Sequence, residues 1–173
     1  MPPIASVSNT YSERLNATAR AGKYLIFRLG SEEFGARVTK VKEIMGIQDV
    51  TPVPQMPAYV MGVINLRGKV IPVVDLRLKF ATNPEEFTAR TCIVVMRTSA
   101  GADELLTGVI VDEVAEVLNL LPSEIEDTPD FGSGVMTPYL LGMAKVKDKV
   151  KILLDIDEVL NNHEFQSLQA LIS

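Results

Sequence analysis

Two side chains of this 173-residue sequence are of types that often act as base or nucleophile, the only histidine, His163, and the only cysteine, Cys92. A small hydrolase would use the imidazole as a general base and the thiol as a nucleophile. However, His163 lies in the polar stretch Asn-Asn-His-Glu, which is typical of a solvated helix residue. Cys92 begins an apolar strand, where a buried, inert thiol is expected. Asp155 and Asp157 are better explained by the capping of a helix than as paired acids. A hydrolase is therefore disfavoured, and binding is the favoured class.

The composition excludes several other kinds of chemistry. One cysteine and one histidine cannot build a Cys/His zinc site within one chain, and a single cysteine cannot form an internal disulfide. The segment Gly132-Ser-Gly134 lacks the lysine and the strand-to-helix context of a phosphate-binding loop. We therefore expect no metal and no cofactor. The net charge of −5 and the absence of tryptophan disfavour a nucleic-acid-binding barrel, which a salt-dependent binding assay would test.

The sequence also bears on location. No apolar run is long enough to span a bilayer, so we expect no direct membrane insertion. The first residues, Met-Pro-Pro-Ile-Ala-Ser, lack the charged and apolar regions of a secretory signal. The expected location is the cytoplasm.

The sequence contains an internal repeat. Residues 59–76 and 139–156 align without a gap. The identical pairs are Tyr59 and Tyr139, Gly62 and Gly142, Lys69 and Lys149, Val70 and Val150, and Asp75 and Asp155. Such a self-match indicates a duplicated supersecondary unit. It also provides an internal control, because residues shared by both copies are those that the fold requires, whereas differences indicate adaptation of one copy.

The repeat extends upstream with shifted spacing. Val38, Val41, Glu43, Ile44 and Met45 have the counterparts Val111, Val114, Glu116, Val117 and Leu118. An apolar run precedes each set, at residues 24–29 and 92–96. We therefore expect two similar lobes in one compact unit between about residues 23 and 158.

Short strands, frequent turns and no alternation of strands with helices predict a mainly β fold of two small barrels with short helices. Leu25, Phe27 and Leu29 share one face and predict a half-buried strand. Hairpin turns are expected at residues 67–69 and 147–149. Pro72, in the second strand of the first hairpin, predicts an edge position or a bulge.

The remaining segments are predicted to be less regular. Residues 1–21 have the composition of a flexible tail, residues 81–90 of a link between lobes or a surface loop, and residues 124–137 of a long loop. Asp155 is expected to accept a hydrogen bond from the Glu158 backbone and to begin a C-terminal helix that includes residues 159–173.

The two hairpins differ at their turns. Gly68 allows a backbone geometry that its counterpart Asp148 adopts at a higher cost. Arg67 has a planar head with several donors, whereas its counterpart Lys147 is a point charge. Two interpretations of Arg67 remain open, a solvated turn residue and a binding residue. Met56 and Met61 are likewise compatible with a core or with an adaptable contact surface.

Several segments match a known family. They are Tyr-Leu-Ile-Phe-Arg-Leu-Gly at 24–30, Val-Lys-Glu-Ile at 41–44, Pro-Ala-Tyr-Val-Met-Gly-Val-Ile-Asn-Leu-Arg-Gly at 57–68, Val-Ile-Pro-Val-Val-Asp-Leu-Arg at 70–77, Gly-Val-Ile-Val-Asp at 108–112 and Ile-Leu-Leu-Asp at 152–155. Over residues 22–160 the sequence closely resembles CheW, the coupling protein of bacterial and archaeal chemotaxis.

The resemblance implies two five-stranded SH3-like barrels around a shared core, within a domain at 22–158 whose lobes meet near residues 80–90. It implies a non-catalytic adaptor, monomeric alone, that links the helical cytoplasmic tip of a methyl-accepting receptor to the histidine kinase CheA. The kinase's regulatory domain resembles the same fold. The residues that match partner-binding positions of the family are Val41, Glu43, Gly62, Arg67 and Val117.

A helical receptor tip is expected to lie in an apolar groove between the lobes. Glu43 and Arg67 would form a polar rim in which they can pair with each other. The alternative within the binding class is a CheW-like adaptor of a related pathway that controls pili or gene expression.

Overall fold

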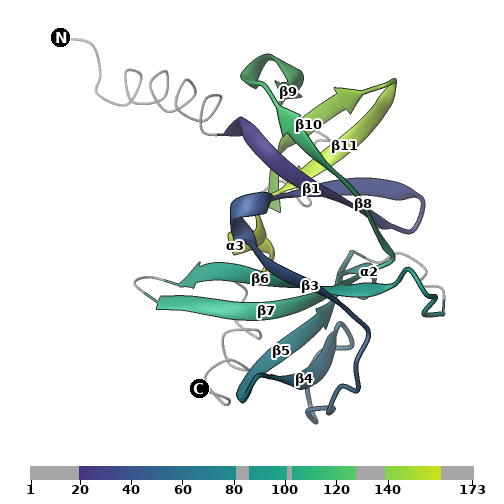
Figure 1. The fold of residues 1–173 in the computed structure, drawn as a ribbon, viewed down its shortest axis with the longest axis vertical. Coiled ribbons are helices and arrows are strands. Elements are labelled where there is room, and N and C mark those ends of the chain that lie inside the picture. Colours follow the sequence, from purple (N-terminus) through teal and green to yellow (C-terminus); the bar gives the residue numbers. More distant parts are fainter. Residues whose placement is uncertain (1–19, 81–85, 101–102, 128–138, 161–173) are drawn as a thin grey trace.

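The computed structural model describes residues 20–80, 86–100, 103–127 and 139–160, which form two β-sheets and four short helices (Figure 1). Sheet A, the upper sheet in the figure, has the strand order β8-β1-β2-β11-β10-β9, and sheet B has the order β3-β6-β7-β5-β4. The strands of sheet A are β1 (Gly22–Leu29), β2 (Glu32–Arg37), β8 (Glu113–Leu120), β9 (Ile125–Glu126), β10 (Leu140–Val146) and β11 (Lys149–Leu154). Those of sheet B are β3 (Val41–Gly46), β4 (Val60–Leu66), β5 (Lys69–Asp75), β6 (Cys92–Ala100) and β7 (Asp103–Val111). The helices are η1 (Val38–Lys40), α2 (Leu76–Lys79), η2 (Pro122–Glu124) and α3 (Ile156–Val159).

Each sheet takes strands from both copies of the repeat. The first hairpin of copy one, β1 and β2, joins the later strands of copy two in sheet A. The first hairpin of copy two, β6 and β7, joins β3, β4 and β5 of copy one in sheet B. Each sheet has two junctions between the copies. One is antiparallel, between β1 and β8 in sheet A and between β3 and β6 in sheet B, and the other is parallel, with Leu153 opposite Gly35 in sheet A and Val73 opposite Gly108 in sheet B. The lobes are therefore interleaved in sequence, and the repeat does not give one sheet per copy.

The predicted mainly β class with two sheets is confirmed, but the predicted closed barrels are not. In the described residues the strand pairing leaves each sheet open, and sheet A has six strands instead of five. In the described residues an isolated bridge links the chain after β3 to β4 of sheet B, and in it Thr51 and Val63 exchange two backbone hydrogen bonds of 2.9 Å. In sheet A the same position relative to the repeat holds the two-residue strand β9, which sequence analysis assigned to a loop.

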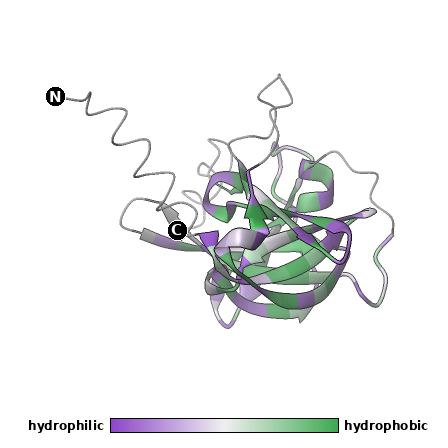
Figure 2. Cartoon of the chain, turned by 90° about the horizontal axis from the view of Figure 1, so that it is seen from above, coloured by the Kyte–Doolittle hydropathy of each residue, from purple (hydrophilic) through white to green (hydrophobic). Residues whose placement is uncertain are grey.

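Three hydrophobic clusters fill the structure, one between the sheets and one inside the curve of each. In β1, Leu25, Phe27 and Leu29 point into the shared cluster, while Tyr24 and Ile26 point into the cluster of sheet A. The shared face was predicted correctly, but the strand is buried on both faces instead of one, because β1 lies between the shared cluster and the cluster of sheet A. Hydrophobic residues accordingly run along the strands of both sheets (Figure 2).

Pro72 lies in a strand that has neighbours on both sides, so the predicted edge position is wrong. The alternative, a bulge, is not at Pro72 either, because the register of the β4–β5 pair shifts between Val60 and Gly62. Pairing between β5 and β7 begins only at Val73. Pro72 pairs with Val63 of β4 and comes just before the first residue of β5 that pairs with β7, so its missing N–H lies at the start of that ladder.

The residues that both copies share make the same contacts. The carbonyl oxygens of Tyr59 and Tyr139 accept hydrogen bonds from the backbone N–H groups of Asp75 and Asp155, at 2.7 and 2.8 Å. Both tyrosine rings also face the ammonium group of Lys79, at 4.4 and 5.8 Å from their centroids. The repeated tyrosine thus anchors the end of each hairpin and brings the two copies together at one lysine.

The repeated aspartate begins a helix in each copy. The Asp75 side chain accepts a hydrogen bond from the Arg77 backbone at the start of α2, and the Asp155 side chain accepts one from the Glu158 backbone at the start of α3. The predicted cap at Asp155 is confirmed. Residues 161–173 of the predicted terminal helix, 1–19 of the tail, 81–85 of the linker and 128–137 of the loop lie outside the described residues.

Two ion pairs connect the sheets at positions related by the repeat. Arg77, at the start of α2, binds Asp112, which lies in the connection from β7 to β8, at 3.1 Å. Asp157, which aligns with Arg77, binds Lys40 of η1, in the connection from β2 to β3, at 2.9 Å. The charges are exchanged between the copies. The Arg77 side chain is 3% exposed, whereas those of Lys40 and Asp157 are 28% and 32% exposed. The ion pair of Arg77 is therefore shielded from solvent, and that of Lys40 is not.

A third ion pair stabilises the parallel junction of sheet A. Lys151 of β11 is buried and its ammonium group donates a hydrogen bond of 2.8 Å to Glu33 of β2. We expect Glu33→Ala to lower the free energy of unfolding by about 2 kcal/mol, because it leaves a buried ammonium without its carboxylate. In copy one the residue that aligns with Lys151 is the buried Ile71, so adding Lys151→Ile to Glu33→Ala should restore most of the loss. Urea denaturation of the two variants measures both effects, and equal stability of the two would contradict this explanation.

Candidate functional site

The predicted hairpin turn between β4 and β5 is present, but it consists of Arg67 and Gly68 alone, because Lys69 already belongs to β5. Both residues have positive φ angles, +51° and +87°, which is the backbone geometry of a type I′ hairpin turn. The Asn65 side-chain oxygen accepts a hydrogen bond of 2.7 Å from the Gly68 backbone N–H. The left-handed conformation of Arg67 is unfavourable for a residue with a side chain, so neighbouring contacts must maintain it.

Arg67 forms a two-pronged ion pair with Glu43 of β3. Its two terminal nitrogens donate hydrogen bonds of 2.6 and 2.9 Å to the two carboxylate oxygens. The pair joins the turn next to one edge strand of sheet B to the edge strand on the opposite side of the sheet. The Arg67 side chain is 71% exposed and that of Glu43 is 24% exposed. The guanidinium is therefore accessible to solvent while it is bound to the less exposed carboxylate. The hydrogen bonds from Arg67 lower the pKa of Glu43, and the pair is charged at neutral pH.

The second copy has the same turn without this ion pair. Lys147 and Asp148 have positive φ angles of +52° and +63°, so Asp148 adopts the geometry that glycine adopts in copy one. In the described part of the chain no ion pair joins Lys147 to Glu116, the counterpart of Glu43. The turn is therefore a property of the fold, whereas the ion pair is a property of copy one.

Of the other residues predicted for the site, Val41 begins β3 and packs against the shared cluster. Val117 lies in β8 of sheet A and is 54% exposed. Both edge strands contain a bulge at the equivalent position of the repeat, just before Glu43 in β3 and near Glu116 in β8. The structure thus brings Glu43 and Arg67 together, and it places Val117 on the edge strand of the other sheet.

Gly62 is buried, and its backbone explains its identity. It has a φ of +140° and lies at a bulge of β4, where the chain after β3 crosses it. A Cβ atom on Gly62 would lie 2.0 Å from the Thr51 carbonyl oxygen. Gly142 has the same role beside β9, where a Cβ would lie 2.7 Å from the Glu126 carbonyl oxygen. Gly62 therefore shapes the segment that adjoins the site and offers no side chain to a partner.

Ile44 is a site residue that sequence analysis did not single out. It is 47% exposed on β3, and Val117, its counterpart in the repeat, is 54% exposed on β8. Each edge strand thus presents one β-branched apolar side chain at the same position of the repeat. The alignment of Ile44 with Val117 was the signal that could have found it, because two equivalent positions that both keep an exposed apolar residue indicate a surface that contacts something.

The candidate catalytic residues do not form a reactive site in the described residues. Cys92 begins β6 and is half-buried, and burial raises the pKa of its thiol, so it is not activated as a thiolate. Asp155 and Asp157 act as a helix cap and as the partner of Lys40. Within residues 20–80, 86–100, 103–127 and 139–160, no group of three His, Cys, Asp or Glu side chains could hold a metal ion. His163 lies outside the described residues.

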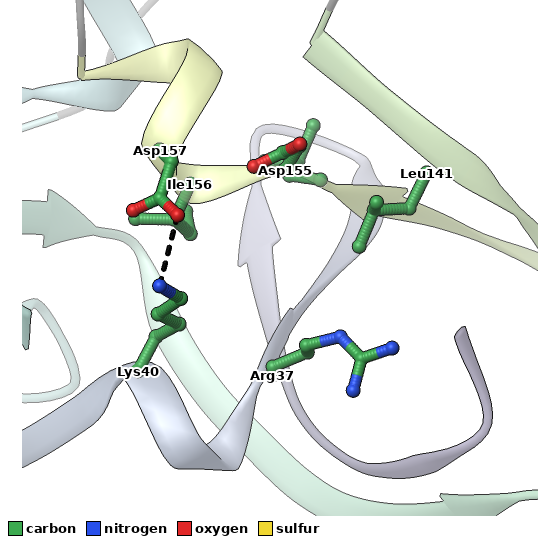
Figure 3. A pocket seen from close by; sticks show the side chains of 7 residues that line it. Arg37, Lys40, Leu141, Asp155, Ile156 and Asp157 are labelled. Carbon is green, nitrogen blue, oxygen red and sulfur yellow. Dashed lines mark hydrogen bonds and ion pairs between the residues drawn. The ribbon is translucent and has the colours of Figure 1, made fainter. Parts of the chain in front are cut away.

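A cavity of about 160 Å³ lies between η1 and α3 (Figure 3). Its lining includes Arg37, Lys40, Asp155 and Asp157, and the Lys40–Asp157 ion pair crosses one side of it. Asp157, which lines the cavity, is the residue that aligns with Arg77 of copy one. The charges that line it are balanced, with two cationic and two anionic side chains. Because Lys40 and Asp157 already pair with each other, the lining does not indicate a particular ligand.

These features define the class, a mainly β protein of two repeat-related sheets with an exposed ion pair on one of them. The chain belongs to the CheW-like domain family, whose sequence model matches residues 23–164. It is 34% identical over 164 residues to the "Chemotaxis protein CheW" of Klebsiella aerogenes, covering 95% of this chain and 93% of that one. It is 35% identical over 144 residues to the protein of the same name from Rhizobium meliloti, covering 83% and 90%.

A solved structure has the same fold. The crystal structure of the scaffolding protein TtCheW from Thermoanaerobacter tengcongensis matches with a TM-score of 0.73 and 28% identity, over 83% of this chain and 90% of that chain. In the described residues no helix is long and apolar enough to cross a bilayer.

Proposed function

We propose that this chain is a non-catalytic adaptor that couples methyl-accepting chemotaxis receptors to the histidine kinase CheA. The observation that carries the proposal is the Glu43–Arg67 ion pair, which is present in one copy of the repeat and absent from the other. Because copy two forms the same turn without an ion pair, the fold does not require the ion pair, and we attribute it to partner binding. The names of the relatives, a chemotaxis protein and a scaffolding protein, support the pathway.

The two edge strands supply apolar contacts for this role. Ile44 on β3 and Val117 on β8 are exposed β-branched residues, and Val41 lies at the start of β3. A receptor tip is a helical hairpin, and an amphipathic helix binds by placing apolar side chains on such positions. Arg67 and Glu43 then form the polar rim that orients the partner, because a guanidinium fixed by one carboxylate still has donors for a second acceptor. The adaptor would act in the cytoplasm, beneath the receptors.

Arg67→Glu tests the proposal. The substitution removes the exposed guanidinium and places a second carboxylate beside Glu43, so the rim changes from one charge of each sign to two negative charges while the core is untouched. We expect binding to the receptor tip, to CheA or to both to weaken by about tenfold to a hundredfold. Titration calorimetry with a soluble receptor cytoplasmic fragment, and separately with purified CheA, measures each affinity.

Lys147→Glu is the matched control. Lys147 occupies the same left-handed turn position in copy two, with a φ of +52° against +51° for Arg67. The control therefore makes the same change of charge in the same backbone geometry. We expect it to leave binding within about twofold of the original value. Unchanged affinity of Arg67→Glu for both partners would refute the assignment of this surface.

A further inference from the structure

Asn65 lies two residues before Arg67, and its contacts differ from those of its counterpart in the repeat. It is exposed near the end of β4, and its side-chain oxygen accepts a hydrogen bond from the Gly68 backbone N–H. This bond closes a small ring around the turn that holds Arg67. The position that corresponds to Asn65 in copy two is occupied by Lys145, which cannot accept such a bond.

The second copy shows that this hydrogen bond is not needed to make the turn. With Lys145 in place of the asparagine and Asp148 in place of the glycine, copy two still forms a two-residue turn with both φ angles positive. A residue that only served the turn would be dispensable in copy one too. What copy one has and copy two lacks, besides the asparagine and the glycine of the turn, is the ion pair from the turn to Glu43.

We infer that Asn65 is a positioning residue, which fixes the turn so that the Arg67 guanidinium stays on Glu43 in the orientation that a partner meets. A two-pronged ion pair needs both nitrogens aligned with both oxygens, and a small rotation of the turn breaks this alignment. The hydrogen bond to Gly68 restrains that rotation from the other side of the turn. The inference rests on the proposed function for its effect on binding, but its effect on the ion pair is independent of any partner.

The first test needs no partner. We expect Asn65→Ala to raise the pKa of Glu43 toward its ordinary value, because the hydrogen bonds from Arg67 are the largest cause of the lowered pKa. The charge of Lys42, which also lowers this pKa, is a smaller cause and stays in place. Titration of the Glu43 carboxyl carbon by NMR measures this change in the full chain. Urea denaturation of Asn65→Ala should show little change in stability, because copy two forms the same turn without an asparagine at this position. An unchanged Glu43 titration in Asn65→Ala would overturn the inference, whatever happens to binding.

The second test connects Asn65 to the partner. We expect Asn65→Ala to weaken binding of the receptor fragment or of CheA by about three- to tenfold. Asn65→Asp, which keeps the acceptor for the Gly68 N–H, should bind as the original chain does. In an Arg67→Ala background the further change Asn65→Ala should have no effect, because the residue acts through Arg67.

The outcomes separate this inference from the proposed function. If Arg67→Ala weakens binding but Asn65→Ala does not, Asn65 has no positioning role and the proposed adaptor surface stands. If Asn65→Ala weakens binding further in the Arg67→Ala background, Asn65 contacts the partner itself and the inference is wrong. If neither variant weakens binding of either partner, the proposed surface and the effect of Asn65 on it are both refuted.

Discussion

Gly62→Ala is expected to destabilise the protein by about 3 kcal/mol or more. The added Cβ would lie 2.0 Å from the Thr51 carbonyl oxygen, 2.7 Å from its carbonyl carbon and 2.9 Å from the Pro52 Cα. These are backbone atoms, which cannot rotate away as the end of a side chain can. The φ of +140° adds strain for any residue with a Cβ. To relieve the clash, the chain after β3 would have to leave β4 and break the two Thr51–Val63 hydrogen bonds.

Gly68→Ala is the control for this prediction. Gly68 also has a positive φ, of +87°, but a Cβ there would have nothing within 4 Å. It should therefore cost only the backbone strain, about 1 kcal/mol. Urea denaturation curves of both variants measure the difference, which isolates the steric clash. Equal denaturation midpoints would show that the crossing of Thr51 over Gly62 is not a rigid feature of the fold. Loss of partner binding by Gly62→Ala would then need a different explanation from displacement of this segment.

Sequence analysis predicted where strands and turns lie more successfully than which strands pair with each other. The period-two pattern of residues 24–29 and the turn residues 67 and 68 identified strands and a hairpin, because those signals are local. The same signals do not say which strands pair. The exchange of β1 and β2 with β6 and β7 between the sheets depends on contacts between residues far apart in the sequence. Val73 and Gly108, which pair in sheet B, are 35 positions apart, and Gly35 and Leu153, which pair in sheet A, are 118 positions apart. No local pattern encodes such contacts.

Within the candidate site, the repeat was the most informative feature of the sequence. Comparing Arg67 with Lys147 identified the position at which copy one differs, and the structure confirms that Arg67 pairs with Glu43. Gly62 is a different case. The recurrence of glycine in both copies indicated a requirement of the fold, and its contact with Thr51 supplies the physical reason. Its effect on a partner remains a prediction, as do the roles of Val41 and Val117.

The charged residues in the interior could not have been found from the sequence. Charged side chains are usually exposed, so a pattern of burial does not reveal them. Arg77, Asp75 and Asp112 are nevertheless buried together, and Asp112 also accepts a hydrogen bond of 2.7 Å from the Gly30 backbone N–H. This network connects α2 of copy one, the β7–β8 connection of copy two and the turn after β1. It forms only when the two copies are interleaved, which is the part of the fold that the sequence did not predict.

Arg77→Met is accordingly expected to be among the most destabilising substitutions in the chain, at about 3–5 kcal/mol. Arg77 donates hydrogen bonds to both oxygens of Asp75, at 3.0 and 2.9 Å, and to Asp112 at 3.1 Å. The hydrogen bonds to Asp75, opposed by burial and reinforced by its charge and by Asp112, raise the pKa of Arg77, so the cation is permanent. Methionine fills a similar volume but leaves two buried carboxylates without a cation.

Lys40→Met provides the comparison, because Lys40–Asp157 is the repeat-related ion pair between the sheets. Its side chains are 28% and 32% exposed, so water replaces the lost partner and the expected cost is under about 1 kcal/mol. Urea denaturation of both variants tests whether burial, and not the presence of an ion pair, determines the cost. If Lys40→Met were as damaging as Arg77→Met, the two contacts would hold the sheets equally. The buried network around Arg77 would then not be the main link between the interleaved copies.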